Sequence, residues 1–172
     1  MDEAPALGIY LNDHVAGAYG GVELARRIAQ THHACADGQV FQRLAADIAA
    51  DRGELLDIMS RLGIKRRRYK SYGAWLVEKL GRLKLNGSLL RRSPLSTLVE
   101  FEALVLGVHG KAALWRTLRL VAEVDDRLDQ VQLHRLAQRA GEQTQLLERW
   151  RMRAAETVFG VSAEQVGVAK EN

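Results

Sequence analysis

The residues of this sequence that could do chemistry are acidic and histidine side chains set within apolar helical patterns. Asp51 interrupts an apolar stripe that runs from Ile48 to Leu55, and Glu102 and His109 flank an apolar stretch later in the chain. Glu102 and His109 are two helical turns apart, about 10 Å along nearly the same line. Two carboxylates and an imidazole that met inside a helical fold could bind iron or manganese. One hypothesis is therefore a metal site formed by Asp51, Glu102 and His109.

The alternative is a structural network of polar side chains. Polar residues also interrupt the apolar stripes of the other helical stretches, and a buried charge without a partner costs several kcal/mol. Asp51 could accept hydrogen bonds from Arg52, Arg116 or His109. The residues that we expect in a buried polar network are His14, Asp51, Glu102, His109 and Gln143.

Four stretches with helical periodicity must position these side chains. Apolar residues recur every three or four positions over residues 5–31, 40–62, 98–120 and 127–159. Only two prolines and a hydrophobic content of 47% agree with an all-helical fold. In the third stretch, the apolar face that contains Leu104 leaves Glu100 and Lys111 on the opposite side, where we expect solvent.

Start and stop signals delimit these helices. Gly63 follows the second stretch as a C-terminal cap. Ser93 and Pro94 begin the third helix, with Thr97 and Glu100 as a capping box. These signals predict a long connection between the end of the second helix and the start of the third.

Three glycines, Gly17, Gly20 and Gly21, lie inside the first helical stretch. A glycine in a helix costs about 1 kcal/mol relative to alanine, so a small side chain must serve a purpose there. Close approach of a neighbouring helix is one explanation, and a cavity for a bound group is the other. The segment GAYGG is not a phosphate-binding loop, because it follows no strand.

Residues 63–92 are strongly basic. They contain ten Lys and Arg residues and a single acidic residue, Glu78, whereas the whole chain carries a net charge of +4. Apolar side chains between Tyr72 and Leu83 predict a short amphipathic helix. The segment could bind nucleic acid or an acidic membrane surface, or simply be solvated. The residues of this candidate polyanion surface are Lys65, Arg66, Arg67, Arg68, Lys70, Trp75, Lys79, Arg82 and Lys84.

The lengths of the links predict how the helices are connected. Short links join the first helix to the second and the third to the fourth, whereas residues 63–96 form a long crossover. A long crossover lets the third helix start at the end where the second started. In this order, and in phrases such as LNDHVAGAYGGVELARRIA, residues 7–159 resemble the ferritin-like superfamily, including rubrerythrin-type proteins. The resemblance implies an antiparallel ferritin-like four-helix bundle.

The resemblance to members of that superfamily that bind two irons implies a specific set of metal ligands. The set is a glutamate on the first and third helices and Glu-x-x-His on the second and fourth. This sequence departs from it, because Glu54 stands where a histidine would follow Asp51, and Gln143 stands where an acid is expected. Glu102 matches the third helix, whereas Glu23 points away from the stripe of the first. These departures favour a bundle that lacks an intact di-iron centre.

Length and composition limit the remaining functions. We expect a single domain over residues 1–172 that ends in a frayed tail, residues 160–172. The single cysteine, Cys35, excludes an internal disulfide and fits a reducing, cytoplasmic compartment. The sequence starts without a signal-peptide pattern and has no uncharged run long enough for a transmembrane segment.

Three hypotheses for function stay open at this point. The first is a non-enzymatic binding or assembly module, a homo-oligomer without a cofactor. The second is an atypical ferritin-like oxidase or storage protein that binds iron or manganese. The third is binding of a polyanion through the basic crossover. We expect no catalytic residues, because no Ser/His/Asp set or phosphate-binding loop occurs at a useful spacing.

Overall fold

The computed structural model describes residues 4–67 and 93–160, and within them it contains four helices and no strand. The helices are α1 (Ala4–Thr31), α2 (Gly38–Arg61), α4 (Pro94–Val121) and α5 (Gln130–Phe159). The prediction of an all-α fold is therefore confirmed. The predicted crossover helix around Trp75 and the tail after Gly160 lie outside the described residues. Among the described residues, no helix combines the length and apolar character that crossing a membrane requires.

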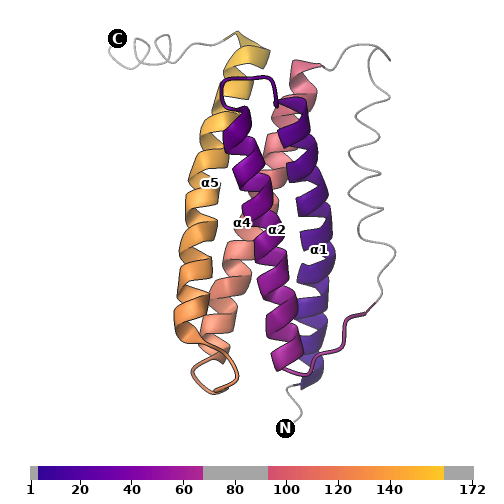
Figure 1. The fold of residues 1–172 in the computed structure, drawn as a ribbon, viewed down its shortest axis with the longest axis vertical. Helices are drawn as coiled ribbons and strands as arrows, with labels where there is room; N and C mark the ends of the chain where they lie inside the picture. Colours follow the sequence, from indigo (N-terminus) through magenta and orange to yellow (C-terminus); the bar gives the residue numbers. More distant parts are fainter. Residues whose placement is uncertain (1–3, 68–92, 161–172) are drawn as a thin grey trace.

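The four helices lie side by side along one long axis (Figure 1). α1 and α2 run in opposite directions and are joined by a short turn over residues 32–37. α4 begins at the end of the molecule where α2 also begins, and α5 returns antiparallel to α4. α1 packs against α2, α4 packs against α5, and α1 also contacts α4. Short links thus join antiparallel neighbours, as their lengths predict.

Hydrophobic side chains from all four helices form one continuous core. Trp115 of α4 and Leu11 of α1 are fully buried in it. Near the α1–α2 turn, Phe41 of α2 packs against Trp150 of α5 and Phe101 of α4, with ring centroids 4.8 and 5.7 Å apart. Aromatic pairs at such distances add about 0.5–1.5 kcal/mol beyond the burial of their area. This aromatic cluster fixes three helices relative to one another.

The end of α2 has the glycine-capped geometry that its sequence predicts. Gly63 has a φ of 70°, its N–H donates to the carbonyl of Ser60, and the N–H of Ile64 donates to the carbonyl of Met59. This pair of hydrogen bonds is the Schellman motif, which satisfies carbonyl groups left open at a helix end. The turn also brings Ile64 against the core.

The starts of α4 and α5 agree only in part with the sequence signals. Ser93 caps α4 as predicted, because its hydroxyl accepts a backbone N–H of the first turn. The predicted capping box is wrong, since Glu100 is buried and pairs with Arg27 of α1. α5 begins after Asp129, whose carboxylate caps it, and not at Arg127.

A buried asparagine holds the chain where it leaves α2. Asn12 of α1 is 3% exposed, and its amide nitrogen donates to the carbonyl oxygens of Gly8 and Lys65 at 2.7 and 3.2 Å. Its amide oxygen accepts from the N–H of Arg67 at 2.7 Å. Because each polar atom of this side chain has a partner, its burial is tolerated. Asn12 thereby ties residues 65–67 to α1, at the opposite end of the molecule from the exposed Cys35 in the α1–α2 turn.

Candidate functional site

Asp51 lies at the centre of a buried charged cluster formed by α2, α4 and α5. Its side chain is 1% exposed, and its two oxygens pair with the ammonium of Lys111 from α4 and the guanidinium of Arg139 from α5. The amide of Gln143, also from α5, donates to Asp51 at 3.1 Å and accepts from Lys111. We call Asp51, Lys111, Arg139 and Gln143 the Asp51 cluster.

The Asp51 cluster meets the electrostatic needs of a carboxylate in the interior. An unpaired charge at this depth would cost several kcal/mol, and here each carboxylate oxygen has a cationic donor. Burial lowers the pKa of Lys111 below its usual value, because the attraction of Asp51 only partly offsets the loss of water. Arg139 reaches inward from the edge with its side chain 29% exposed, so part of its charge stays hydrated.

The structure buries part of the predicted polar network. Asp51 and Gln143 are buried and hydrogen-bonded to each other, and His14 is partly buried. The side chain of Glu102 is 46% exposed and lies 3.8 Å from Arg151, and His109 is exposed. The prediction that both side chains point into the interior is therefore wrong for His109, whereas Glu102 is about half exposed and lines the cavity described below.

The partners of Asp51 also differ from those expected. The guanidinium of Arg52 lies over the ring of Tyr19, 4.8 Å from its centroid, and Arg116 is exposed. Lys111, which we expected in solvent, supplies one of the positive charges instead. An interior ion pair forms at Asp51, but with Lys111, which the sequence interpretation had placed in solvent, and with Arg139, which it had not considered.

A spacing in the sequence could have identified Lys111. It stands seven residues after Leu104 and seven before Leu118, and both leucines are buried. Positions seven apart lie nearly on one line of a helix, so Lys111 must share the buried line. Glu100 is the second buried charge on this helix: its side chain is 3% exposed and accepts from the Nε of Arg27 at 2.9 Å. It joins α4 to α1, and its expected place in solvent was also wrong.

The metal hypothesis finds no support in the arrangement of these side chains. In the part of the chain that the structure describes, no group of three or more His, Cys, Asp or Glu residues is placed to hold a metal ion. Both oxygens of Asp51 already accept from cationic groups. Glu54, one turn along α2, accepts from the amide of Gln132 at 2.6 Å. The ammonium of Lys111, the guanidinium of Arg139 and the amide of Gln143 therefore occupy the positions around Asp51 that further metal ligands would need.

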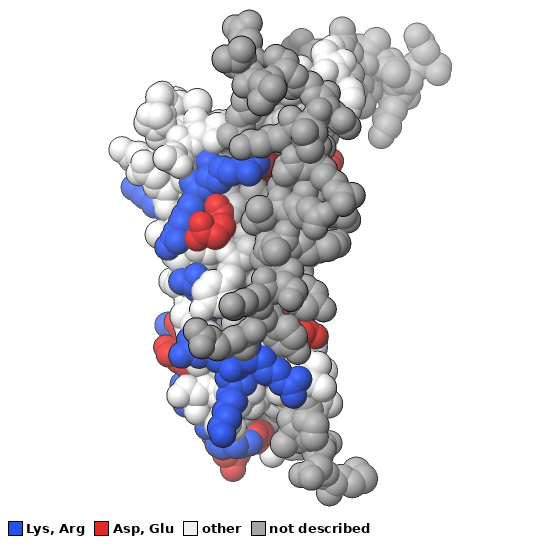
Figure 2. All heavy atoms as spheres, turned by 90° about the vertical axis from the view of Figure 1, so that its right-hand side faces the viewer, with Lys and Arg blue, Asp and Glu red and all other residues white. Residues whose placement is uncertain are grey.

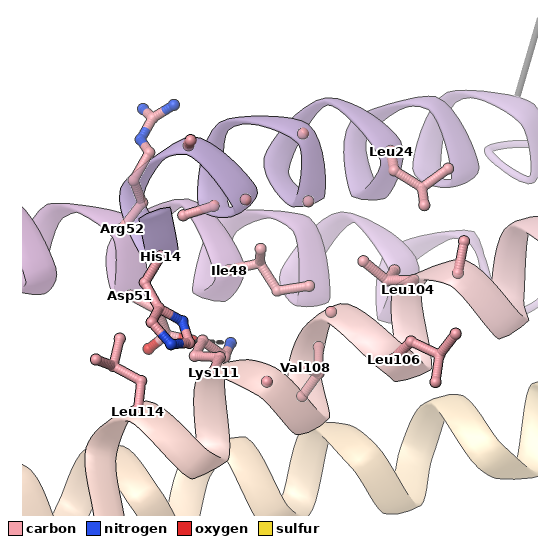
Figure 3. A pocket seen from close by; sticks show the side chains of 18 of the residues that line it. His14, Leu24, Ile48, Asp51, Arg52, Leu104, Leu106, Val108, Lys111 and Leu114 are labelled. Carbon is pink, nitrogen blue, oxygen red and sulfur yellow. Dashed lines mark hydrogen bonds and ion pairs between the residues drawn. The ribbon is translucent and has the colours of Figure 1, made fainter. Parts of the chain in front are cut away.

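A cavity of about 880 Å³ lies beside the Asp51 cluster, between α1, α2 and α4 (Figure 3). Apolar side chains such as Leu24 and Leu104 line one end of it, and His14, Asp51 and Lys111 lie together at the other end. Its walls are mostly apolar. A concave, largely apolar space with a few convergent polar groups is the usual form of a small-molecule site.

Glycines account for the width of this cavity. Gly17, Gly20 and Gly21 of α1 and Gly107 and Gly110 of α4 all line it. For Gly17, Gly21, Gly107 and Gly110, an added Cβ would meet no atom of the described residues within 4 Å, so no described helix approaches Gly17 or Gly21 closely. The second explanation that the sequence left open, a cavity, agrees with this geometry.

His14 of α1 is a further titratable group at the polar end of the cavity, beside Asp51 and Lys111. In Figure 3 its ring points into the cavity toward Asp51 and Lys111, and it meets the ring of Tyr10 edge-on, with centroids 4.6 Å apart. Burial lowers the pKa of His14, and the charge of the neighbouring Asp13 offsets only part of this effect. The imidazole is therefore mainly neutral at pH 7 and can donate one hydrogen bond and accept one.

The described part of the basic segment is exposed. Lys65, Arg66 and Arg67 extend into solvent at the end of the molecule where α2 ends. On the face seen in Figure 2, described Lys and Arg side chains gather in two places, one of them toward this end. The other members of the candidate polyanion surface lie outside the described residues, namely Arg68, Lys70, Trp75, Lys79, Arg82 and Lys84. Polyanion binding stays a prediction.

No protein family, no curated protein and no solved structure matches this chain. Membership of the ferritin-like superfamily therefore stays a prediction from the sequence. The side chains of the site itself therefore indicate what it can bind. They form a closed charged cluster next to an open, largely apolar cavity.

Proposed function

We propose that this chain is a ferritin-like helical protein without a working di-iron centre, and that it acts as a non-enzymatic binding module. Its binding site is the glycine-lined cavity between α1 and α4, closed at one end by the Asp51 cluster. Assembly into a homo-oligomer belongs to the same proposal. Large apolar side chains that are exposed at the end of α4, on the α4–α5 link and at the start of α5 support it: Leu120, Val124 and Val131.

The directions of the helices support the ferritin-like part of the proposal. α2 and α4 begin at the same end of the molecule, although they follow each other in the sequence. A long connection that spans the length of the fold is needed for this arrangement, and ferritin-like bundles are built with one.

The chemistry of the Asp51 cluster supports the absence of a working metal centre. A bound iron or manganese ion needs several carboxylate or imidazole ligands with free lone pairs. Lys111 and Arg139 supply positive charge to Asp51 in the way that a metal ion would, so the carboxylate is neutralised by the protein itself. A second cation at this point would be repelled by both of them.

The cavity is the observation that carries the proposed binding function. Its volume of about 880 Å³ falls in the range of about 300–1,000 Å³ that is usual for small-molecule sites. Five glycines from two helices line it, each at a cost in helix stability. At four of them, Gly17, Gly21, Gly107 and Gly110, no described atom lies within 4 Å of an added Cβ, so stability alone would favour a larger side chain there.

The test uses the neutral apolar dye N-phenyl-1-naphthylamine, whose fluorescence rises when it leaves water. We expect saturable binding with one dye per chain. The substitution Gly17→Leu fills the cavity from α1 and should weaken binding at least tenfold, because the leucine occupies the space of the dye. Elemental analysis of the same protein after exposure to iron or manganese should find no stoichiometric metal.

The matched control is Gly141→Leu on α5. Gly141 is also a helical glycine with no described atom within 4 Å of an added Cβ, but it does not line the cavity. This variant should bind the dye as the unmodified chain does. Equal loss of dye binding in both variants, or no saturable binding at all, would contradict the proposed site. One or two bound metal ions per chain would contradict the proposal that the chain lacks a working metal centre.

A further inference from the structure

The buried polar groups of the cavity are concentrated at one of its ends, whereas the half-exposed Glu102 lies near the other. Figure 3 shows His14, Asp51 and Lys111 together at the polar end, whereas Leu24, Leu104 and Leu106 lie toward the other. A molecule that filled the cavity would therefore meet apolar walls along most of its length and polar groups at one end. Such a cavity fits an amphiphile better than a uniformly apolar or uniformly polar compound.

The charge at the polar end is positive. Within the Asp51 cluster, one carboxylate faces two cations, Lys111 and Arg139, so one positive charge is left over. Asp47 also attracts Lys111, but it is exposed, so water and salt weaken its field. An anion placed beside Lys111 would balance the surplus charge in a region with little water.

Two further carboxylates line the cavity, but both are accessible to water. Glu102 is 46% exposed and lies 3.8 Å from Arg151, and Asp13 is exposed. Their charges are hydrated and screened, whereas Lys111 has only 15% of its side chain exposed. The buried end therefore determines the preferred charge of a ligand.

The unused hydrogen-bonding groups at this end are donors. An ammonium has three protons, and among the described residues Lys111 gives them to two acceptors, Asp51 and Gln143. Trp115 lines the same cavity, is fully buried, and its indole N–H finds no partner among the described residues. A buried donor without an acceptor is costly, so a ligand that brings an acceptor would be favoured. The acceptors of Asp51, in contrast, are already used.

We propose that the cavity binds an amphiphilic carboxylate of the fatty-acid type. The hydrocarbon part lies between the glycine-lined faces of α1 and α4, and the carboxylate accepts hydrogen bonds from Lys111 at the polar end. Trp115 and neutral His14 can act as further donors to the same group. This inference rests on the proposed binding function, and it adds the chemical class of the ligand.

The experiment compares dodecanoate with dodecanol, which have the same chain length and differ in the head group. Each is used to displace N-phenyl-1-naphthylamine at pH 7.5. Dodecanoate carries a charge that Lys111 attracts and dodecanol does not, so we expect dodecanoate to bind at least about tenfold more tightly. In Lys111→Met the ratio should fall below about twofold, because dodecanoate loses a charge partner and dodecanol loses only a hydrogen bond.

Two other variants separate the role of Lys111 from general effects on the fold. Arg116→Met removes an exposed positive charge from the same helix, outside the cavity, and should leave the ratio unchanged. Trp115→Phe removes the free indole N–H with a small change in volume and should weaken dodecanoate several-fold more than dodecanol. If Lys111→Met does not fold, as judged by circular dichroism, Trp115→Phe still tests the inference.

The possible results distinguish the two proposals. If both compounds displace the dye with equal affinity, or if Lys111→Met keeps the preference for dodecanoate, the carboxylate inference is wrong and the binding function stands. If the dye itself does not bind, the proposed function is wrong and the inference falls with it. A preference for dodecanoate that is lost in Lys111→Met supports both.

Discussion

Asp51 is held in the interior by donors from two other helices. Lys111 comes from α4, and Arg139 and Gln143 come from α5, so one carboxylate joins three helices. Polar groups of this kind contribute little net stability compared with apolar packing, yet removal of one partner leaves the others buried and unpaired. The Asp51 cluster should therefore specify how α2, α4 and α5 align, more than it raises the total stability.

Replacement of Asp51 by alanine tests this role. We expect Asp51→Ala to lower the free energy of unfolding by about 3–5 kcal/mol, because Lys111 and Arg139 lose their counter-charge. Urea unfolding followed by circular dichroism measures the change. The control is Glu23→Ala, which breaks an exposed pair with Arg26 and should cost less than about 1 kcal/mol. Similar losses in the two variants would show that the cluster is not the interior ion-pair centre described here.

The sequence predicted which helices form, and where they begin and end, better than it predicted which side of each helix faces the core. Gly63 and Ser93 have the backbone roles that their residue types indicate. Glu100 and Lys111 were wrongly predicted to lie on the solvent side of α4. Apolar residues of this helix occur on most of its sides, so its periodicity does not identify a single buried face. A helix of this kind takes its orientation from its neighbours, which the local pattern does not contain.

Two glycine substitutions of the same type should have opposite effects. Gly63→Ala should destabilise the fold by about 1–2 kcal/mol, because its φ of 70° is strained for a residue with a Cβ. Gly17→Ala should instead stabilise it by up to about 1 kcal/mol, since the helix gains alanine and the added Cβ meets no atom of residues 4–67 and 93–160 within 4 Å. Thermal and urea unfolding of both variants provide the measurement. A loss of stability in Gly17→Ala would indicate that a helix approaches closely there after all.

For the whole molecule, polar contacts join the two helical hairpins in addition to the shared core. Glu54 of α2 accepts from Gln132 of α5, and Tyr10 of α1 donates to Thr117 of α4 at 3.3 Å. The candidate site lies where α1, α2 and α4 meet, so it exists only when both hairpins are in place. The sequence indicated the glycines and Asp51, but the cavity between them depends on distances that arise from packing and are not encoded in any local pattern.

We therefore expect the four helices to unfold in a single transition. The variant Trp75→Phe would leave Trp115 of α4 and Trp150 of α5 as the tryptophans, so fluorescence would report on the second hairpin. Circular dichroism reports on all the helices. The two urea transitions should coincide, as they do for a cooperative fold. A fluorescence transition at clearly higher urea would mean that α4 and α5 stay folded without α1 and α2.

The exposed Cys35 in the α1–α2 turn also matters for any measurement of assembly. It is the chain's single cysteine and has an exposed side chain. In air-oxidised solution two chains can become covalently linked through this thiol, which would resemble a genuine dimer in chromatography. The same thiol accepts one maleimide dye without any mutation, so sedimentation and energy-transfer experiments can use the natural sequence, provided that a reducing agent is present until the moment of labelling.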